Sequence, residues 1–308
     1  IQRIPYPDPI LSNKINSRNI SSQMLKKLVV NMSKKVAANC LPTILKIKHI
    51  FGLSQSVEEV EIVAEFLSKT TDDLHSSHCI DIGFHSGGSS RCFLKYFAGV
   101  LAFEPFPEVF KKTSKFVLKN PKLDLRCQAI SSEIGEAEFY LSNTSSGISS
   151  LSKDESLHQS SIKVQTTTLI CALTTYRERD LRRFGCIKID VEGYEEVVLR
   201  QISELDDLRP SVIISEFQDL KSGFGDLKRQ LTIGFKMGYY CVLSLWNPVA
   251  RYGCSHEWDR FIPIQSLQLA DPICSYVFSG WGNLIFVKPD LYGELISYLS
   301  SYELRKKQ

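Results

Sequence analysis

The chain has 308 residues, of which 43% are hydrophobic and 23% are charged, a composition typical of a globular protein with one substantial core. It contains no run of about 18 apolar residues, so the sequence predicts no membrane-spanning helix, and residues 1–10 lack the basic start and apolar block of a secretion signal. Nine cysteines are scattered without a CxxC pair, which argues against a zinc site and favours a reducing, cytoplasmic location.

Positive charge is concentrated at the start of the chain. Residues 1–50 contain nine Lys or Arg but only one acid, Asp8, whereas the whole chain has a net charge of +3. Residues 24–40 place apolar side chains on one helical face and four lysines on another, which predicts a basic amphipathic helix. We expect a partly helical extension over residues 1–56 that either packs on the rest of the protein or contacts an anionic membrane surface or acidic partner. No nucleic-acid-binding module is visible, so no nucleic-acid partner is expected.

Helical and strand patterns alternate from residue 57 onward. A helix is predicted over residues 57–69, and strands are predicted over residues 78–83, 99–105, 123–131, 186–190, 210–217, 239–245 and 283–289. This alternation predicts an α/β domain over residues 57–308, with a doubly wound, Rossmann-like, mostly parallel sheet of seven strands that binds ligands at the carboxyl ends of its strands. Residues 135–141 and 161–169 alternate apolar and polar side chains, and they predict an antiparallel excursion from that sheet.

The first predicted strand ends on Asp81 and leads into a glycine-rich turn, in the segment CIDIGFHSGGSS. The spacing D-x-G-x-x-x-G differs from the G-x-G-x-x-G of dinucleotide sites, and an acid before the turn would repel phosphates. The same acid suits the cationic amino-acid part of S-adenosylmethionine, and Glu104, which ends the next strand, is placed to accept hydrogen bonds from ribose hydroxyls. The alternative is that the turn is only a tight connection between a strand and a helix.

The segment CIKIDVEGYEEVVL has a lysine inside a strand that should be almost wholly apolar. An unpaired ammonium there is costly, so we expect Lys188 to meet an anion. Either Lys188 forms a structural ion pair with Asp190 or Glu192, or these groups place a methyl acceptor and take its proton. The expected catalytic residues are Lys188, Asp190, Glu192, Glu216 and His256, the last three being candidates for the base. Acids such as Asp190 and Glu216 also suit Mg²⁺, but we expect a reaction without a metal.

Residues 246–282 lie between the last two predicted strands and contain all three tryptophans of the chain. Aromatic faces rimmed by polar side chains suit the faces and hydroxyl edges of a sugar ring, so this insert is a candidate lid over an acceptor. The alternative is a small satellite core under a long loop. The expected acceptor-binding residues are Trp246, Tyr252, His256, Trp258 and Trp281.

Several segments, taken in order and spacing, resemble the FkbM family of S-adenosylmethionine-dependent methyltransferases. They are CIDIGFHSGGSS, AFEPFPEVF, CQAISSEIGEAEFYL, SGISSL, TTTL, IKIDVEGYEEVVL, PSVIISEF and NLIFVKP, which together span about residues 77–290. The chain departs from the family pattern at His85, where Asn is usual, and at Ile170 and Cys171, where an acidic pair is usual.

The resemblance implies that the methionine part of the cofactor lies on the glycine turn, the ribose on Glu104 and the adenine on residues 129–131. The expected cofactor-binding residues are Asp81, Gly83, His85, Gly87, Ser89, Glu104, Pro105, Ala129, Ile130, Ser131 and Asp190. Members of the family commonly methylate hydroxyls of glycans or natural products. We therefore expect an O-methyltransferase for a sugar or glycoconjugate, with a non-carbohydrate acceptor or a catalytically silent binding module as alternatives.

Overall fold

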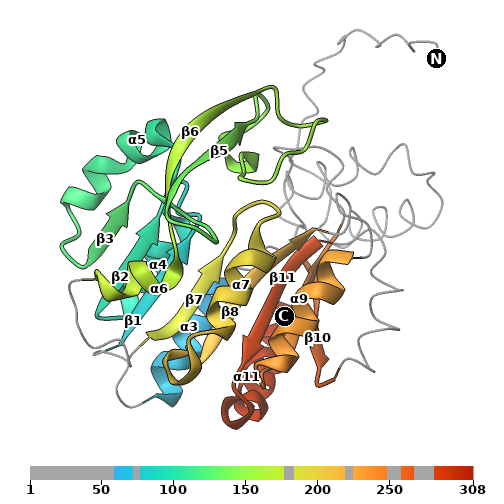
Figure 1. Ribbon diagram of the computed structural model, residues 1–308. Helices are drawn as coiled ribbons and strands as arrows, with labels where there is room; N and C mark the ends of the chain where they lie inside the picture. The colour runs from blue at the N-terminus through green and yellow to red at the C-terminus, as the bar shows by residue number, and fades with distance from the viewer. Residues whose placement is uncertain are drawn as a thin grey trace, which may run out of the picture. The chain divides into compact units, whose positions relative to one another are not determined.

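Eight strands form the main sheet, in the order β10-β9-β11-β8-β7-β1-β2-β3, and helices cover both of its faces (Figure 1). The strands are His78–Ile82 (β1), Gly99–Phe103 (β2), Leu123–Arg126 (β3), Phe184–Ile189 (β7), Val212–Gln218 (β8), Tyr240–Trp246 (β9), Trp258–Ile264 (β10) and Trp281–Val287 (β11). The computed structural model describes residues 59–71, 77–176, 184–218, 225–247, 258–266 and 281–307, which fall within one compact unit, Gln55–Gln308. The predicted extension over residues 1–56 lies outside them, so that division of the chain stays a prediction.

The predicted α/β class is confirmed, but the predicted strand number and orientation need correction. Strands β3, β2, β1, β7 and β8 run parallel, whereas β11 is antiparallel to both β8 and β9, and β10 is antiparallel to β9. The eighth strand, β10, comes from inside the insert at residues 246–282 and pairs along β9. Sequence periodicity missed it because the segment WDRFIPI lacks a regular alternation of apolar and polar residues.

A separate sheet of three strands has the order β4-β6-β5 and is formed by Ala129–Ile130 (β4), Gly135–Leu141 (β5) and Ser160–Thr167 (β6). The predicted antiparallel pairing of the excursion is confirmed for β5 and β6. The strand predicted over residues 123–131 divides in two, because β3 joins the main sheet whereas β4 pairs with β6. The excursion therefore begins directly after the third strand of the main sheet.

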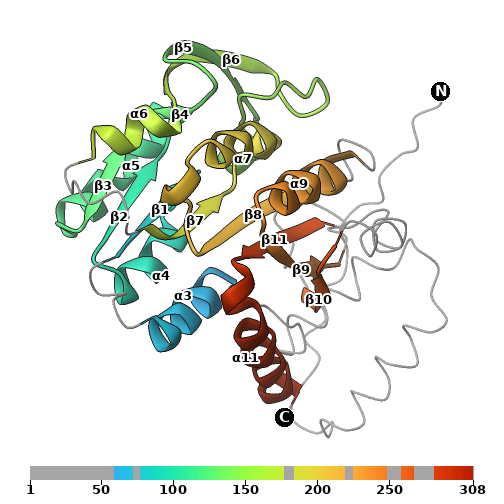
Figure 2. The same ribbon diagram turned by 60° about the horizontal axis from the view of Figure 1, so that its bottom comes forward.

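The helices are Glu59–Thr70 (α3), Gly88–Tyr96 (α4), Pro107–Leu118 (α5), Leu169–Thr174 (α6), Glu195–Ser203 (α7), Gly225–Lys236 (α9) and Pro289–Lys307 (α11), and Ser146–Ile148 and Asp206–Leu208 form short 3-10 turns. Buried residues of α6, α7 and α9 pack on one face of the main sheet, and those of α3, α4 and α11 pack on the other. Figure 2 shows α3 and α11 on the face away from α7. The sheet is buried on both faces, as parallel sheets usually are.

Apolar side chains at helical spacing explain the covering helices. In α3, Val60, Val63 and Leu67 recur at intervals of three and four residues and are buried against the sheet.

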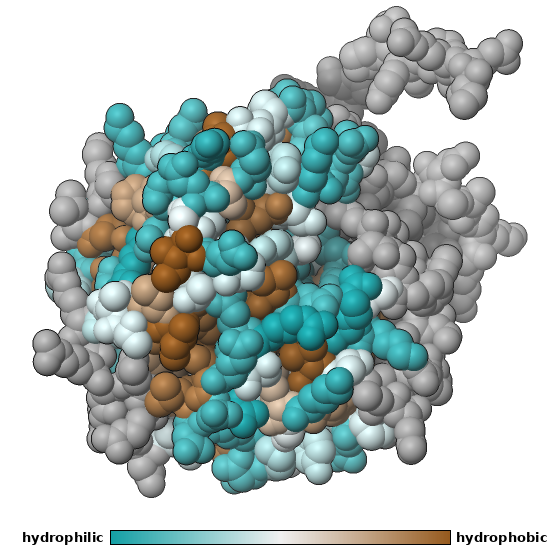
Figure 3. All heavy atoms as spheres, in the orientation of Figure 1, coloured by the Kyte–Doolittle hydropathy of each residue, from teal (hydrophilic) through white to brown (hydrophobic). Residues whose placement is uncertain are grey.

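The surface carries few large hydrophobic side chains. Figure 3 shows a face on which hydrophobic residues form separate spots among hydrophilic ones. Among the described residues, only Ile134 and Ile170 are exposed large hydrophobic side chains, and none of the described helices is long and apolar enough to cross a membrane.

Candidate cofactor site and neighbouring acid cluster

A cavity of about 270 Å³ lies at the carboxyl ends of β1, β2 and β7, where the topology predicts a ligand crevice. Seven of the expected cofactor-binding residues line it: Gly83, His85, Glu104, Pro105, Ala129, Ile130 and Asp190. The other four, Asp81, Gly87, Ser89 and Ser131, do not appear among its lining residues. Ser131 lies beside the cavity, where its backbone carbonyl accepts a hydrogen bond from Gln201.

Gly83 lets the end of β1 approach the end of β7. Its φ is +94°, and a Cβ atom at this position would lie 1.8 Å from the carbonyl oxygen of Asp190. The backbone N–H of Asp190 donates to the carbonyl oxygen of Ile82 at 2.9 Å, which holds the two strand ends together. Only glycine combines this φ with such a close backbone contact. The turn therefore places Asp190 on the wall of the cavity.

Glu104 follows β2, and its buried carboxyl group organises the turn after β1. One oxygen accepts the backbone N–H of His85 at 2.7 Å, and the other accepts the N–H of Phe106 at 2.9 Å. Burial raises the pKa of Glu104 to about 7, although both hydrogen bonds oppose this rise. A carboxylate has about four lone-pair sites, so two further hydrogen bonds remain available on the cavity side. These acceptors suit a ribose diol.

Asp81 lies beneath the cavity and is fully buried. Its Oδ2 accepts a hydrogen bond from the hydroxyl of Ser90 at 2.6 Å. Its Oδ1 is buried and has no hydrogen-bond partner among the described residues. Burial raises the pKa of Asp81 to about 6, and the nearby Lys188 charge opposes that rise. An orphaned acceptor oxygen beside the glycine turn fits the cationic end of S-adenosylmethionine.

Lys188 forms the ion pair that its position in a buried strand requires. Its ammonium group donates to Asp190, and it stands in register opposite Asp81 on the neighbouring strand. Burial alone would lower the pKa of Lys188, but the charges of Asp190 and Asp81 raise it above its usual value. Burial alone would raise the pKa of Asp190, but Lys188 holds it below its usual value. Lys188 and Asp190 therefore stay charged as a pair.

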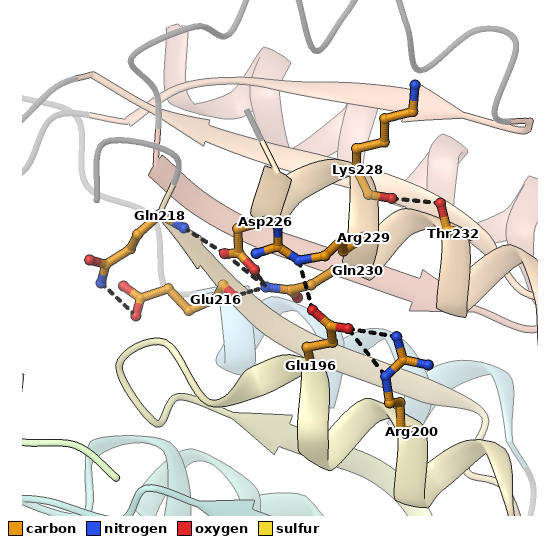
Figure 4. A network of polar contacts seen from close by, with 9 residues as sticks. All are labelled: Glu196, Arg200, Glu216, Gln218, Asp226, Lys228, Arg229, Gln230 and Thr232. Carbon is orange, nitrogen blue, oxygen red and sulfur yellow. Dashed lines mark hydrogen bonds and ion pairs between the residues drawn. The ribbon is translucent and has the colours of Figure 1, made fainter. Parts of the chain in front are cut away.

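Asp190, Glu192 and Glu216 bring one carboxylate oxygen each within 4.8 Å of the others. The register of β7 with β1 and β8 explains this, because strands that end beside one another bring their terminal residues together. The side-chain amide of Gln218 donates to Glu216 at 3.0 Å (Figure 4). The same amide also donates to Glu192 at 3.0 Å. Burial and the charge of Asp190 raise the pKa of Glu216 well above its usual value.

Glu195 is a buried acid that sequence reasoning did not single out. Its two carboxylate oxygens accept the backbone N–H groups of Val191 and Gly193, each at 2.9 Å. Burial raises the pKa of Glu195 to about 8, with the Asp226 charge as a further cause. These bonds hold Glu192 at φ 58°, a left-handed conformation that is uncommon for a residue other than glycine. The sequence feature that could have identified Glu195 is its position as an acid in the first turn of the helix that follows DVEGY.

Apolar and small residues complete the cavity. Phe103, Phe139, Leu151 and Tyr194 line it, as do Ser146 and Gly147 of the 3-10 turn that follows β5. Phe139 belongs to the three-stranded sheet, so the excursion supplies one wall of the site. The sequence predicted this excursion but gave it no function, because local periodicity does not show where a hairpin folds back.

The three tryptophans of the expected lid are used in packing. Trp246 and Trp258 are buried in the core with α3 and α11. The indole N–H of Trp246 donates to Glu59 at 2.6 Å, that of Trp258 to Ser244 at 3.2 Å, and that of Trp281 to the carbonyl oxygen of Asn247 at 3.0 Å. This packing fits the core alternative better than the lid. Tyr252 and His256 lie outside the described residues, so their predicted roles stay predictions.

The sequence matches the FkbM methyltransferase domain over residues 81–241, more than half of the chain. The glycine turn, the acid after β2 and the buried strand carrying Lys188 all fall within this match. The fold is of the doubly wound α/β class, with a cavity at the carboxyl ends of its strands. The chain belongs to the FkbM family and is an S-adenosylmethionine-dependent methyltransferase. The cavity fits that cofactor through Glu104, which lines it and has acceptor sites left beside its two backbone hydrogen bonds.

Solved structures with a similar fold include several methyltransferases. The O-methyltransferase TomG from Streptomyces achromogenes, in complex with SAM, is 9% identical, with 85% of this chain and 96% of TomG covered at a TM-score of 0.40. Precorrin-6y C5,15-methyltransferase from Geobacter metallireducens is 13% identical, covering 76% and 94% at 0.36. An rRNA methylase from Streptococcus thermophilus is 10% identical, covering 76% and 99% at 0.37. These identities and TM-scores are too low to bear on the activity of this chain. No curated protein matches the chain.

Proposed function

We propose that this protein is an O-methyltransferase that methylates a hydroxyl of a sugar or glycoconjugate. The observation that carries the proposal is the position of Glu192, which lines the cofactor cavity. A hydroxyl is a weak nucleophile, so its methylation benefits from a base that takes its proton. Glu192 is such a base at the place where the acceptor must approach.

Each part of the site has a role in this reaction. When bound, S-adenosylmethionine supplies a methyl group on a sulfonium sulfur. Glu192 would take the proton of the acceptor hydroxyl as that oxygen receives the methyl group. Gln218 orients Glu192 through its side-chain amide. In-line placement of the acceptor supplies much of the rate enhancement.

Lys188 and Asp190 act by position and charge. Their ion pair fixes the end of β7, and Asp190 lines the cavity. Glu216 is a poorer candidate for the base than Glu192, because Glu192 lines the cofactor cavity and Glu216 is not among its lining residues. His256 is the further candidate for the base. A cytoplasmic location belongs to the same proposal, as does a basic extension that either packs on the rest of the protein or contacts an anionic membrane surface or acidic partner.

An acceptor screen with labelled cofactor tests this function. The purified protein is incubated with methyl-labelled S-adenosylmethionine and a panel of monosaccharides, glycosides, phenols and amines. We expect label in the carbohydrate fraction as an alkali-stable methyl ether. Label only in phenols or amines would support the alternative acceptors and contradict the proposal.

The remaining alternative is a catalytically silent binding module. Two measurements distinguish this alternative from an enzyme: calorimetry with S-adenosylmethionine and the rate of methyl transfer. Both are made on the parent and on Glu192→Gln, a substitution that keeps the shape of the side chain. We expect the variant to bind cofactor like the parent but to transfer methyl groups at least about tenfold more slowly. Equal rates for parent and variant would remove Glu192 from the reaction.

A further inference from the structure

A second cavity, of about 380 Å³, lies against the cofactor cavity. It is lined by the loop after β7, the end of β8, the start of α9 and the loop between β5 and β6. Figure 4 shows three of its residues, Gln218, Asp226 and Arg229, at the end of β8 and on α9. Nothing in the cofactor role described above uses this space.

Two short stretches of chain separate the cavities. Leu151 lines the cofactor cavity and Ser152 the second one, whereas Glu192 lines both. The Ser150 hydroxyl donates to the carbonyl oxygen of Val191 at 3.0 Å, which ties the two stretches together. Glu192 therefore stands at the boundary between the cavities, where a hydroxyl entering from the second cavity would meet its carboxylate.

Polar groups dominate the lining of the second cavity. It contains five acids, two bases and a single aliphatic side chain, Leu157. All five acids have partners. Glu195 holds backbone N–H groups, and Asp226 accepts hydrogen bonds from Gln218 and Gln230. Glu192 accepts a hydrogen bond from Gln218, Asp154 accepts two from Ser156, and Glu155 pairs with Lys153. The acids exceed the bases, so the cavity favours hydroxyl or ammonium donors and disfavours carboxylates and phosphates.

His158 lines the same cavity but is committed to holding its loop. Its Nδ1 accepts the backbone N–H of Asp154 at 2.9 Å, so the ring hydrogen lies on Nε2, which faces the carbonyl oxygen of Ile148 at 2.9 Å. The ring also stacks on Tyr140 with centroids 6.1 Å apart. Both ring nitrogens are used, so this histidine shapes the cavity and leaves Glu192 as the proton acceptor.

Arg229 supplies donors to the cavity from α9. Its Nε donates to Glu196 at 2.7 Å, and Glu196 also accepts two hydrogen bonds from Arg200 (Figure 4). The two Nη groups of Arg229 donate to no side chain or carbonyl in the part of the chain that the structure describes. Glu196 thus fixes the guanidinium plane while two N–H₂ groups stay available for hydroxyl oxygens.

We propose that this second cavity holds the methyl acceptor, that the acceptor is hydroxyl-rich and either uncharged or positively charged, and that Arg229 determines its specificity. This inference rests on the proposed function and adds the location and charge class of the acceptor. The excursion between β3 and α6 then has a role in acceptor recognition as well as cofactor binding.

Two variants with a matched control test the location. Ser152→Trp fills the cavity from a position that does not line the cofactor cavity, and Arg229→Ala removes the free donors. Arg200→Ala is the control, because Arg200 pairs with the same Glu196 but does not line the second cavity. Thermal melts confirm folding, and calorimetry with S-adenosylmethionine confirms an intact cofactor site.

Methyl transfer is measured with methyl glucoside, glucosamine and glucuronic acid as uncharged, cationic and anionic probes. We expect turnover of the first two, loss of transfer in Ser152→Trp, and about a tenfold lower kcat/KM for Arg229→Ala. Arg200→Ala should stay within about twofold of the parent, and all variants should bind cofactor normally.

Three results would overturn the inference: normal transfer by Ser152→Trp, equal effects of Arg229→Ala and Arg200→Ala, or preference for glucuronic acid. A parent protein that binds cofactor but methylates none of the probes or any other hydroxylated acceptor would fail at the proposed function, and the inference would fall with it.

Discussion

Two buried carboxyl groups lie in different halves of the sheet and differ in how their oxygens are used. Glu59 lies under the half formed by β9, β10 and β11, and it accepts hydrogen bonds from Ser244 and Trp246, each at 2.6 Å. Asp81 lies in the half formed by β1, β2 and β7, and its Oδ1 has no partner among the described residues. Burial raises the pKa of both groups. A raised pKa by itself therefore does not identify a ligand site.

The unsatisfied oxygen is the feature that distinguishes the two halves. Protein donors surround Glu59, and Trp258 extends the network through its hydrogen bond to Ser244. Such a satisfied buried network specifies packing. Around Asp81 and Glu104, acceptor sites remain open next to a cavity. An open acceptor in a buried place is costly unless a ligand completes it, so this half is the one built to bind.

The largest expected effect is a loss of stability when a tryptophan is removed from the half of the sheet formed by β9, β10 and β11. Trp246→Ala removes a buried indole and leaves Glu59 without one donor, so unfolding should cost about 3–5 kcal/mol less than in the parent. Chemical denaturation measures this loss, and calorimetry on the folded fraction should give parental cofactor affinity. An unchanged denaturation midpoint combined with a raised acceptor KM would instead support the acceptor lid.

The tryptophans also show where sequence reasoning reached its limit. Their concentration in residues 246–282 was visible, but their packing depends on Trp258 and Trp281 standing opposite Trp246 in the antiparallel ladder. That ladder joins residues distant in the sequence. The buried hydrogen-bond partner of Trp246 is Glu59, which lies on α3 at the start of the described residues. Composition predicted an aromatic cluster without showing which side of the sheet it covers.

The next effect concerns the binding half. Glu104→Ala removes the acceptors for the ribose hydroxyls and should weaken S-adenosylmethionine binding by about 1.5–3 kcal/mol, the scale of hydrogen bonds to a charged group. Isothermal titration calorimetry measures the change. Glu108→Ala, an exposed acid in the first turn of α5, is the matched control and should bind like the parent. Parental affinity in Glu104→Ala would refute the ribose assignment.

A smaller effect is expected from pH. The pKa of Glu104 in the cofactor-free protein is about 7, so the group is mostly protonated at pH 6 and mostly ionised at pH 8. Binding to ribose hydroxyls favours the carboxylate, and below pH 7 its proton must first be lost. Cofactor affinity should therefore rise by up to about tenfold from pH 6 to pH 8 and then level off. Glu104→Gln should remove most of this dependence in the same titration, and a persistent slope would assign it to another group.

The polar residues of the site show which of its parts could be predicted from the sequence. Asp81, Glu104 and Asp190 follow strands that the sequence made visible, and parallel neighbours must end at one edge. Gln218 and Glu195 were missed because their roles depend on geometry across the chain: Gln218 bridges Glu192 and Glu216, and Glu195 folds back on the loop before its own helix. Both are ordinary polar residues until the loop conformation is known.

The smallest expected effect is that of metal removal. Asp190, Glu192 and Glu216 have the oxygen ligands and proximity that Mg²⁺ prefers. Their negative charge is already offset, since Lys188 pairs with Asp190 and Gln218 donates to Glu192 and Glu216. A cation would have to compete with the ammonium group of Lys188 and with these hydrogen bonds. Activity in a chelator should therefore equal activity without one.

The opposite outcome is a loss of activity that added Mg²⁺ restores. It would show that the three acids are metal ligands, and a hydroxyl activated by the metal would then take the place of Glu192 acting as base.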